Sequence, residues 1–121
     1  MKSLIAAAVD VASIGVFAAI GRASHAESDG LVGVLSTAWP FLAGWAAGAL
    51  ITRFWRRPAA LSTGAGVWIA TVAGGILLRA ATGGGVQLSF VIVAATVLAV
   101  FLLAWRTGYA IFTRRRSAVP A

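Results

Sequence analysis

The residue best suited to chemistry in this sequence is Asp10, an acid that lies inside a long apolar segment. An ionised acid near the middle of a membrane costs about 2.5–3.5 kcal/mol on insertion scales, so it must pair, bind a proton or face a cavity. Arg53 and Arg106 end apolar segments within its reach, whereas Arg79 lies at the opposite membrane surface. We therefore expect an Asp10–Arg106 pair. Three roles stay open: a structural ion pair, a protonatable site for coupled transport, and an exposed cavity with neither role.

A second polar cluster is predicted at the opposite membrane surface, formed by Arg22, His25 and Arg79. A histidine changes its charge near neutral pH, and two arginines can hold an anionic group. The same residues are also compatible with solvated loops and with long side chains that anchor helix ends at the interface. Both interpretations are kept.

Few residues remain for any other chemistry. The sequence has three acids, one histidine and no cysteine, so it offers no disulfide framework and no thiolate nucleophile. A lone histidine is not a metal site, because such sites need three or four ligands. The glycines at 83–85 lack the lysine and hydroxyl of a phosphate-binding loop. We expect no metal, no cofactor and no enzymatic activity.

The elements that must position these residues are membrane helices. Of 121 residues, 60% are apolar and 11% are charged, against about 45–50% and about 25% in soluble domains. A water-soluble chain of this length could not bury so much apolar surface. Four segments reach the roughly 20 apolar residues that a spanning helix needs, at about 4–21, 31–52, 61–78 and 88–105. The prediction is a single integral membrane domain over residues 1–121, an all-α four-helix transmembrane bundle.

The basic residues predict the orientation of this bundle. Two lie on one side, Arg22 and Arg79, and eight lie on the other, namely Lys2, Arg53, Arg56, Arg57, Arg106, Arg114, Arg115 and Arg116. Since cytoplasmic loops carry the excess of Lys and Arg, both termini are expected in the cytoplasm and the protein in the inner (plasma) membrane. The net charge of +7 is thus explained by orientation and anionic lipid. The lipid bilayer, and not nucleic acid, is the expected partner.

The first segment also partly resembles a secretory signal, because Lys2 precedes an apolar run that ends near Ser24-His-Ala26. Signal peptides have an apolar region of about 7–15 residues. This run is longer and contains Asp10. We expect the first helix to be retained.

Small residues spaced by four predict where the helices pack. Gly44 and Gly48 form such a pair in the second segment, and Gly66 and Gly74 belong to a similar stripe in the third. Small residues let helix backbones approach in a membrane. Packing within one bundle is the simpler interpretation, and a homodimer through Gly44 and Gly48 is the alternative.

Pro40 lies inside the second segment and is expected to kink it, because proline removes one hydrogen bond of the helix. The functional alternative is a freed carbonyl that lines a polar cavity.

Several local patterns together resemble a known family. They are Asp10, Phe17-Ala-Ala-Ile-Gly-Arg22-Ala-Ser-His25, Thr37-Ala-Trp-Pro-Phe41, Gly74-Gly-Ile-Leu-Leu-Arg79, Ser89-Phe-Val and Trp105-Arg106. The chain resembles small integral membrane proteins of actinobacteria and haloarchaea that are catalogued as a domain of unknown function. The resemblance implies a four-helix inner-membrane protein and no assigned activity. More loosely, the chain is similar to small multidrug-resistance transporters in having four short helices and an acid in the first, but its charge asymmetry and aromatic pattern differ.

Two classes of function follow from these observations. The first is a structural or accessory membrane protein that contacts a second copy or another membrane protein through its helices. The second is a small proton- or cation-linked transporter or channel-like protein that uses Asp10. The two differ in one physical respect, since a transporter needs a water-accessible path to Asp10, whereas an accessory protein keeps this residue dry and paired.

Overall fold

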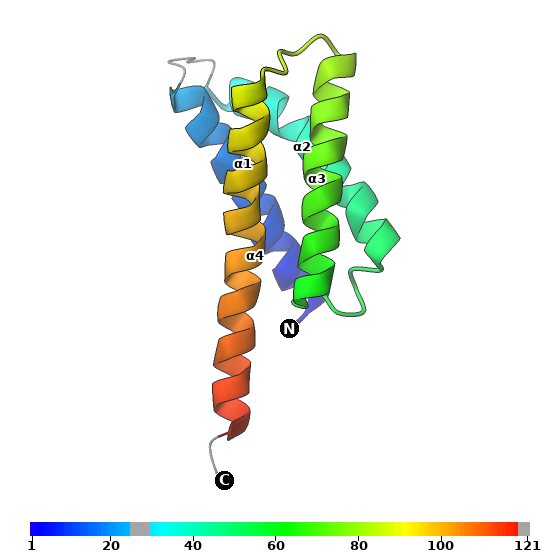
Figure 1. The fold of residues 1–121 in the computed structure, drawn as a ribbon, viewed down its shortest axis with the longest axis vertical. Coiled ribbons are helices and arrows are strands. Elements are labelled where there is room, and N and C mark those ends of the chain that lie inside the picture. Colours follow the sequence, from blue (N-terminus) through cyan, green and yellow to red (C-terminus); the bar gives the residue numbers. More distant parts are fainter. Residues whose placement is uncertain (25–29, 119–121) are drawn as a thin grey trace.

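The computed structural model describes residues 1–24 and 30–118 and forms four helices (Figure 1). They are α1 (Ser3–Ser24), α2 (Gly30–Thr52), α3 (Leu61–Ala81) and α4 (Leu88–Ala118). Each is long and apolar enough to cross a membrane. The prediction of an all-α fold with four candidate membrane spans is confirmed, and α4 continues past the expected apolar segment at 88–105 to Ala118.

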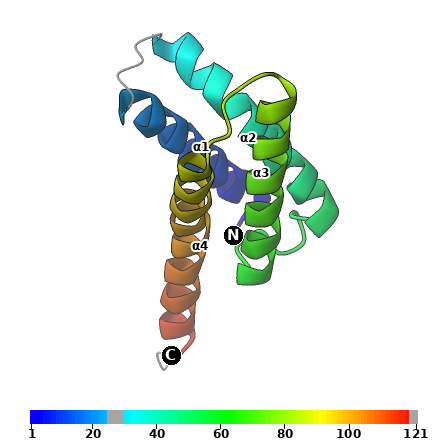
Figure 2. The same ribbon diagram turned by 45° about the horizontal axis from the view of Figure 1, so that its top comes forward.

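The helices form a closed ring in which each one packs against its neighbour in the chain and α4 returns to α1. The most extensive contact joins α2 and α3. Figures 1 and 2 show α3 and α4 side by side, with α1 and α2 slanting behind them. The amino terminus and the last turn of α4 lie at the same end of the bundle (Figure 1). An even number of alternating helices requires this.

The fourth helix is longer than the others. Its 31 residues span about 46 Å at 1.5 Å per residue, whereas helices of 21 to 23 residues span about 32–35 Å. The end of α4 therefore projects past the bundle (Figure 2). It carries the exposed side chains of Arg114, Arg115 and Arg116.

A buried stripe on each helix faces the centre. On α4 the buried side chains recur every four residues, at Ala94, Leu98, Leu102 and Arg106, which is the spacing of one helical face. Outward-facing positions carry large apolar side chains such as Ile51, which is 80% exposed. A soluble protein would not expose so many, so the outer surface has the character of a lipid-facing one.

The packing between α2 and α3 depends on glycine. A Cβ atom on Gly44 would lie 2.6 Å from the Ala70 carbonyl oxygen, and one on Gly74 would lie 2.9 Å from the Gly44 Cα. A Cβ on Gly48 would lie 2.6 Å from the Ala70 Cβ. The backbones are thus as close as small residues permit. Within the single chain, α3 occupies this face of α2.

The fourth glycine of the predicted set, Gly66, faces α2 near its end, where an added Cβ would lie 2.5 Å from the Thr52 Cγ2. The structure therefore places all four predicted packing glycines at the same interface within one chain. Whether the protein also forms a homodimer stays a prediction.

Helix α2 continues through Pro40, which is buried within it. Proline has no N–H, so the carbonyl of Ser36, four residues earlier, loses the helical partner it would otherwise have. The kink itself stays a prediction.

The turn after α2 brings an aromatic ring back into the bundle. Arg53 has a φ of 54°, and its N–H and that of Phe54 donate to the carbonyls of Leu50 (3.3 Å) and Ala49 (2.9 Å). This pattern is a Schellman motif with arginine in the left-handed position that glycine usually occupies. The turn leaves the Phe54 side chain only 4% exposed and starts the loop that returns to α3.

Candidate functional site

The structure brings Asp10 of α1 and Arg106 of α4 together in a buried ion pair. The Arg106 Nη2 lies 2.7 Å from the Asp10 Oδ2, and Nη1 donates to Oδ1 at 2.8 Å. Both side chains are 0% exposed. The guanidinium therefore binds the carboxylate through two parallel hydrogen bonds, which is the strongest geometry available to this pair.

Two tryptophans complete the coordination of the carboxylate. The indole N–H of Trp105 donates to the Asp10 Oδ1 at 2.9 Å, and that of Trp45 donates to Oδ2 at 3.0 Å. A carboxylate offers about four lone-pair sites. With two donors from Arg106 and two from the tryptophans, each oxygen has two partners, so the buried charge is fully hydrogen-bonded.

The arginine is held as firmly as the acid. Its Nε donates to the carbonyl of Pro58 at 3.1 Å, and Nη1 also donates to the carbonyl of Leu102 at 2.8 Å. Its aliphatic stem passes Gly64 of α3, where an added Cβ would lie 2.5 Å from the Arg106 Cδ. Only glycine leaves room for the arginine at this position.

Aromatic rings surround the guanidinium. The Arg106 Cζ lies 4.4 Å from the ring centroid of Trp105 and 5.9 Å from that of Phe54, both within the range of a cation–π contact. Phe54 in turn packs edge-on against Trp45, with ring centroids 5.4 Å apart. The site thus replaces the hydration of the ion pair with fixed donors, carbonyls and π-faces.

This cluster joins every part of one end of the bundle. Asp10 comes from α1, Trp45 from α2, Pro58 from the following loop, Gly64 from α3 and Arg106 from α4. A contact between two neighbouring helices involves only those two, whereas this cluster involves all four. The arrangement fixes the relative positions of all four helices.

Sequence reasoning selected the ion pair and missed its tryptophan partners. Trp105 looks like a residue of the aromatic belt at the membrane surface, whereas its indole N–H points inward to Asp10. A partner for Trp45 could have been predicted, because an indole N–H in the middle of an apolar helix needs a hydrogen-bond acceptor. Asp10 is the one acid among the described residues, and it is therefore the natural acceptor.

The tryptophan hydrogen bonds allow a first prediction. Replacing Trp45 or Trp105 by phenylalanine should lower the free energy of unfolding by about 1–2 kcal/mol each, because a buried carboxylate oxygen loses a donor. Unfolding in mild detergent, followed by circular dichroism, measures the change. Trp55→Phe is the matched control, since Trp55 is 54% exposed and its replacement should have an effect below about 0.5 kcal/mol. Equal losses in all three variants would contradict the assignment.

The other predicted site residues lie apart from this pair. Arg53, the rival partner for Asp10, has an exposed side chain at the end of α2. Arg79 lies at the opposite end of the bundle, beside Phe90. His25 and the side chain of Arg22 lie outside the described residues, so the outer cluster of three stays a prediction.

The expectation that the protein holds no metal stays a prediction. Residues 1–24 and 30–118 contain no group of three or more His, Cys, Asp or Glu side chains that could hold an ion.

Comparison with known proteins gives a family match. The model of a family described as "Protein of unknown function (DUF3054)" matches residues 7–109. The matched range includes Asp10, Trp45, Trp105 and Arg106, and hence all side chains of the ion-pair cluster. No curated protein and no solved structure matches the chain.

Proposed function

The chain belongs to the DUF3054 family of proteins of unknown function, and we propose that it is a structural or accessory membrane protein. It acts through helix contacts, with a second copy of itself or with another membrane protein. We place it as a multi-pass protein in the inner (plasma) membrane with both termini in the cytoplasm. The sequence resemblance implies an inner-membrane protein, and the excess of basic residues on one side of the bundle supports the cytoplasmic placement of the termini.

The observation that carries this proposal is the state of Asp10. A site that couples transport to a proton or cation needs water access and a free position on its carboxylate. Asp10 is 0% exposed, and all four hydrogen bonds to its oxygens come from side chains of the protein. This favours a structural role for the Asp10–Arg106 ion pair, which we call the structural lock, over a carboxylate that binds and releases a proton or cation. The proposal includes no catalytic activity, because the one acid among the described residues is engaged in this way.

The charges support the orientation that we propose. Arg114, Arg115 and Arg116 lie on the projecting end of α4, at the same end of the bundle as the amino terminus (Figure 1). Basic residues at this position interact favourably with the anionic lipids of the cytoplasmic leaflet, by about 1 kcal/mol each. The lock and the basic extension therefore lie at the same end.

A flux measurement tests the proposal against a transporter. The full chain is reconstituted into liposomes that contain a pH-sensitive dye, and a pH gradient is imposed. We expect proton flux equal to that of protein-free liposomes for the wild type and for Asp10→Asn alike. Flux that is present in the wild type and in an Arg57→Gln control, but absent in Asp10→Asn, would contradict the proposal. It would favour the alternative, a small proton- or cation-linked transporter that uses Asp10.

The contact part of the proposal needs a separate measurement. The protein is extracted from its native membrane in mild detergent, and the mass of the complex is determined by light scattering with correction for detergent. We expect a defined complex that contains more than one chain. A uniform single copy of 12.4 kDa would contradict the proposed mode of action even if no flux is found.

A further inference from the structure

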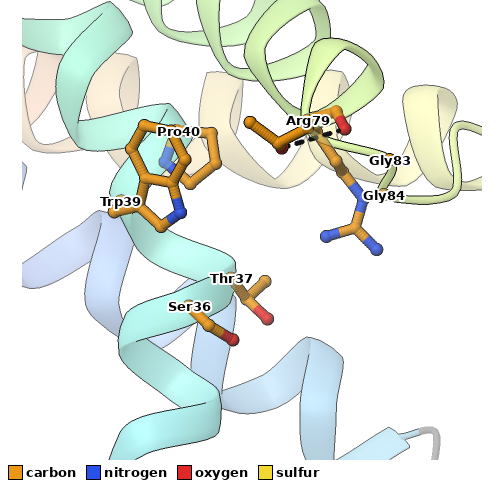
Figure 3. A pocket seen from close by; sticks show the side chains of 8 residues that line it. Ser36, Thr37, Trp39, Pro40, Arg79, Gly83 and Gly84 are labelled. Carbon is orange, nitrogen blue, oxygen red and sulfur yellow. Dashed lines mark hydrogen bonds between the residues drawn. The ribbon is translucent and has the colours of Figure 1, made fainter.

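A polar pocket lies at the end of the bundle opposite to the ion pair. Its volume is about 370 Å³, which is in the lower part of the range for small-ligand sites. It lies between the first half of α2 and the end of α3 (Figure 3). The lining residues are Ser36, Thr37, Trp39, Pro40, Arg79, Thr82, Gly83 and Gly84.

Arg79 is the charged residue among the described lining residues, and the turn that follows α3 fixes its side chain. Gly83 has a φ of 83°, a left-handed conformation in which glycine is favoured. This turn lets the Gly84 N–H donate to the Arg79 carbonyl at 2.8 Å. The Arg79 Nε then donates to the Gly85 carbonyl at 2.7 Å, and its guanidinium stacks 4.4 Å from the ring centroid of Phe90.

These contacts use one edge and one face of the guanidinium and leave the other edge for a ligand. Among the described residues, Nη1 and Nη2 of Arg79 have no hydrogen-bond partner. Figure 3 shows that the Arg79 guanidinium and the side chains of Ser36 and Thr37 border the same pocket. Such a preformed fork binds an oxyanion through two hydrogen bonds and loses little side-chain entropy in doing so.

The remaining lining fits an oxyanion that also carries hydroxyl groups. Trp39 is 45% exposed at the rim, with an indole N–H donor. Ser36 also lines the pocket. Its hydroxyl donates to the Gly33 carbonyl at 3.0 Å, and its oxygen can still accept a hydrogen bond from a ligand hydroxyl. Among the lining residues that the structure describes there is no carboxylate, so this lining favours an anion over a cation.

We propose that this pocket binds a phosphate group through Arg79. Arginine is the preferred partner of phosphate because its planar donors match the spacing of two phosphate oxygens. The pocket opens beside Trp39, and tryptophan is typical of the membrane interface, which is also where phospholipid phosphates lie. The shared chemistry is a phosphate oxyanion, presented by a lipid head group or by a free solute. The proposal does not depend on the role of Asp10.

Two arms of one experiment test the proposal and distinguish the sources. The full chain in neutral detergent is titrated with inorganic phosphate against chloride at matched ionic strength. In parallel it is titrated with dioctanoyl phosphatidylglycerol against dioctanoylglycerol, which has the same acyl chains and no phosphate. The readouts are the shift in unfolding temperature and the number of bound molecules by native mass spectrometry. We expect saturable binding of one molecule in the phosphatidylglycerol arm, the phosphate arm or both.

Variants at the pocket must weaken this binding. Arg79→Gln should raise the dissociation constant about tenfold or more, since a charge-assisted pair of hydrogen bonds is lost. Arg79→Lys should weaken it less, because the charge remains while the fork is lost. Gly84→Ala keeps every charge, but its Cβ would lie 2.6 Å from the Arg79 Cγ and should displace the side chain. Arg57→Gln, which removes an exposed arginine at the other end, should bind like the wild type.

The outcomes separate clearly. Saturation by phosphatidylglycerol alone assigns the phosphate to a lipid, and saturation by inorganic phosphate as well shows that the oxyanion suffices. Absence of saturable binding in both arms overturns the proposal. So does an equal loss in Arg79→Gln and Arg57→Gln, which would indicate unspecific surface charge. Unfolding without ligand checks that each variant is folded, and the unchanged charge of Gly84→Ala keeps the test decisive.

Discussion

Asp10→Asn should lower the free energy of unfolding by about 3–5 kcal/mol, and Arg106→Gln should do so by a similar amount. Each change strands one member of a pair in which both side chains are 0% exposed. Removing one partner of such a pair leaves a buried charge without compensation, which is the costly case. The loss in either single variant therefore exceeds the net contribution of the whole ion pair to the free energy of unfolding.

The double variant tests this argument. With both charges removed, no ion is stranded, and Asp10→Asn/Arg106→Gln should recover much of the stability that either single change loses. The coupling energy from the four proteins should therefore reach several kcal/mol and have the sign of a favourable pair. Reversible unfolding in mild detergent, with identical detergent for all variants, provides the values.

A control isolates the pair from general charge effects. Arg53→Gln removes a charge at the same end of the bundle from an exposed side chain, and its effect should stay below about 0.5 kcal/mol. If Asp10→Asn is neutral or stabilising, the carboxylate is kept at a cost in stability, as residues at working sites often are. That result would contradict the structural role of the ion pair and favour the alternative, a transporter that uses Asp10.

The sequence predicted this pair because the possibilities were few. Of the three acids in the sequence, only Asp10 lies inside an apolar segment, and a membrane helix can bring it only to arginines at a similar depth. The remaining partners could not be predicted in the same way. Phe54 reaches the site because Arg53 adopts a left-handed conformation that no sequence pattern marks. The Pro58 carbonyl is a backbone group, and its position depends on the course of the whole loop after α2.

The pocket at the other end of the bundle is likewise only partly predictable from the sequence. The sequence places Arg79 at this membrane surface, and for Pro40 it predicts a kink, with a freed carbonyl that lines a polar cavity as the alternative. The sequence does not place these two residues beside one another, because they are far apart in the chain and meet only through the pairing of α2 with α3. The glycines at 83–85 lack the lysine and hydroxyl of a phosphate-binding loop. Their observed role is to hold an arginine in place.

The pairing of α2 with α3 leads to the second large prediction. Gly44→Leu should lower the free energy of unfolding by about 3 kcal/mol or more, toward the upper end for overpacked sites. The first atom of the new side chain would already lie 2.6 Å from the Ala70 carbonyl oxygen and 3.2 Å from the Gly75 nitrogen. Both are backbone atoms of α3, so no rotamer change relieves the contact and the two helices must separate.

Gly15→Leu is the matched control for this change. Gly15 also lies within a membrane helix, but a Cβ placed there meets no atom within 4 Å. Leucine has a higher helix propensity than glycine by up to about 1 kcal/mol, so this variant should be neutral or slightly more stable. The same chemical substitution is thus expected to have opposite signs at the two positions, as measured by unfolding in detergent. A similar loss at both would mean that the side chain itself is poorly tolerated, and a tolerated leucine at Gly44 would show that α2 and α3 do not approach as closely as the structure has them.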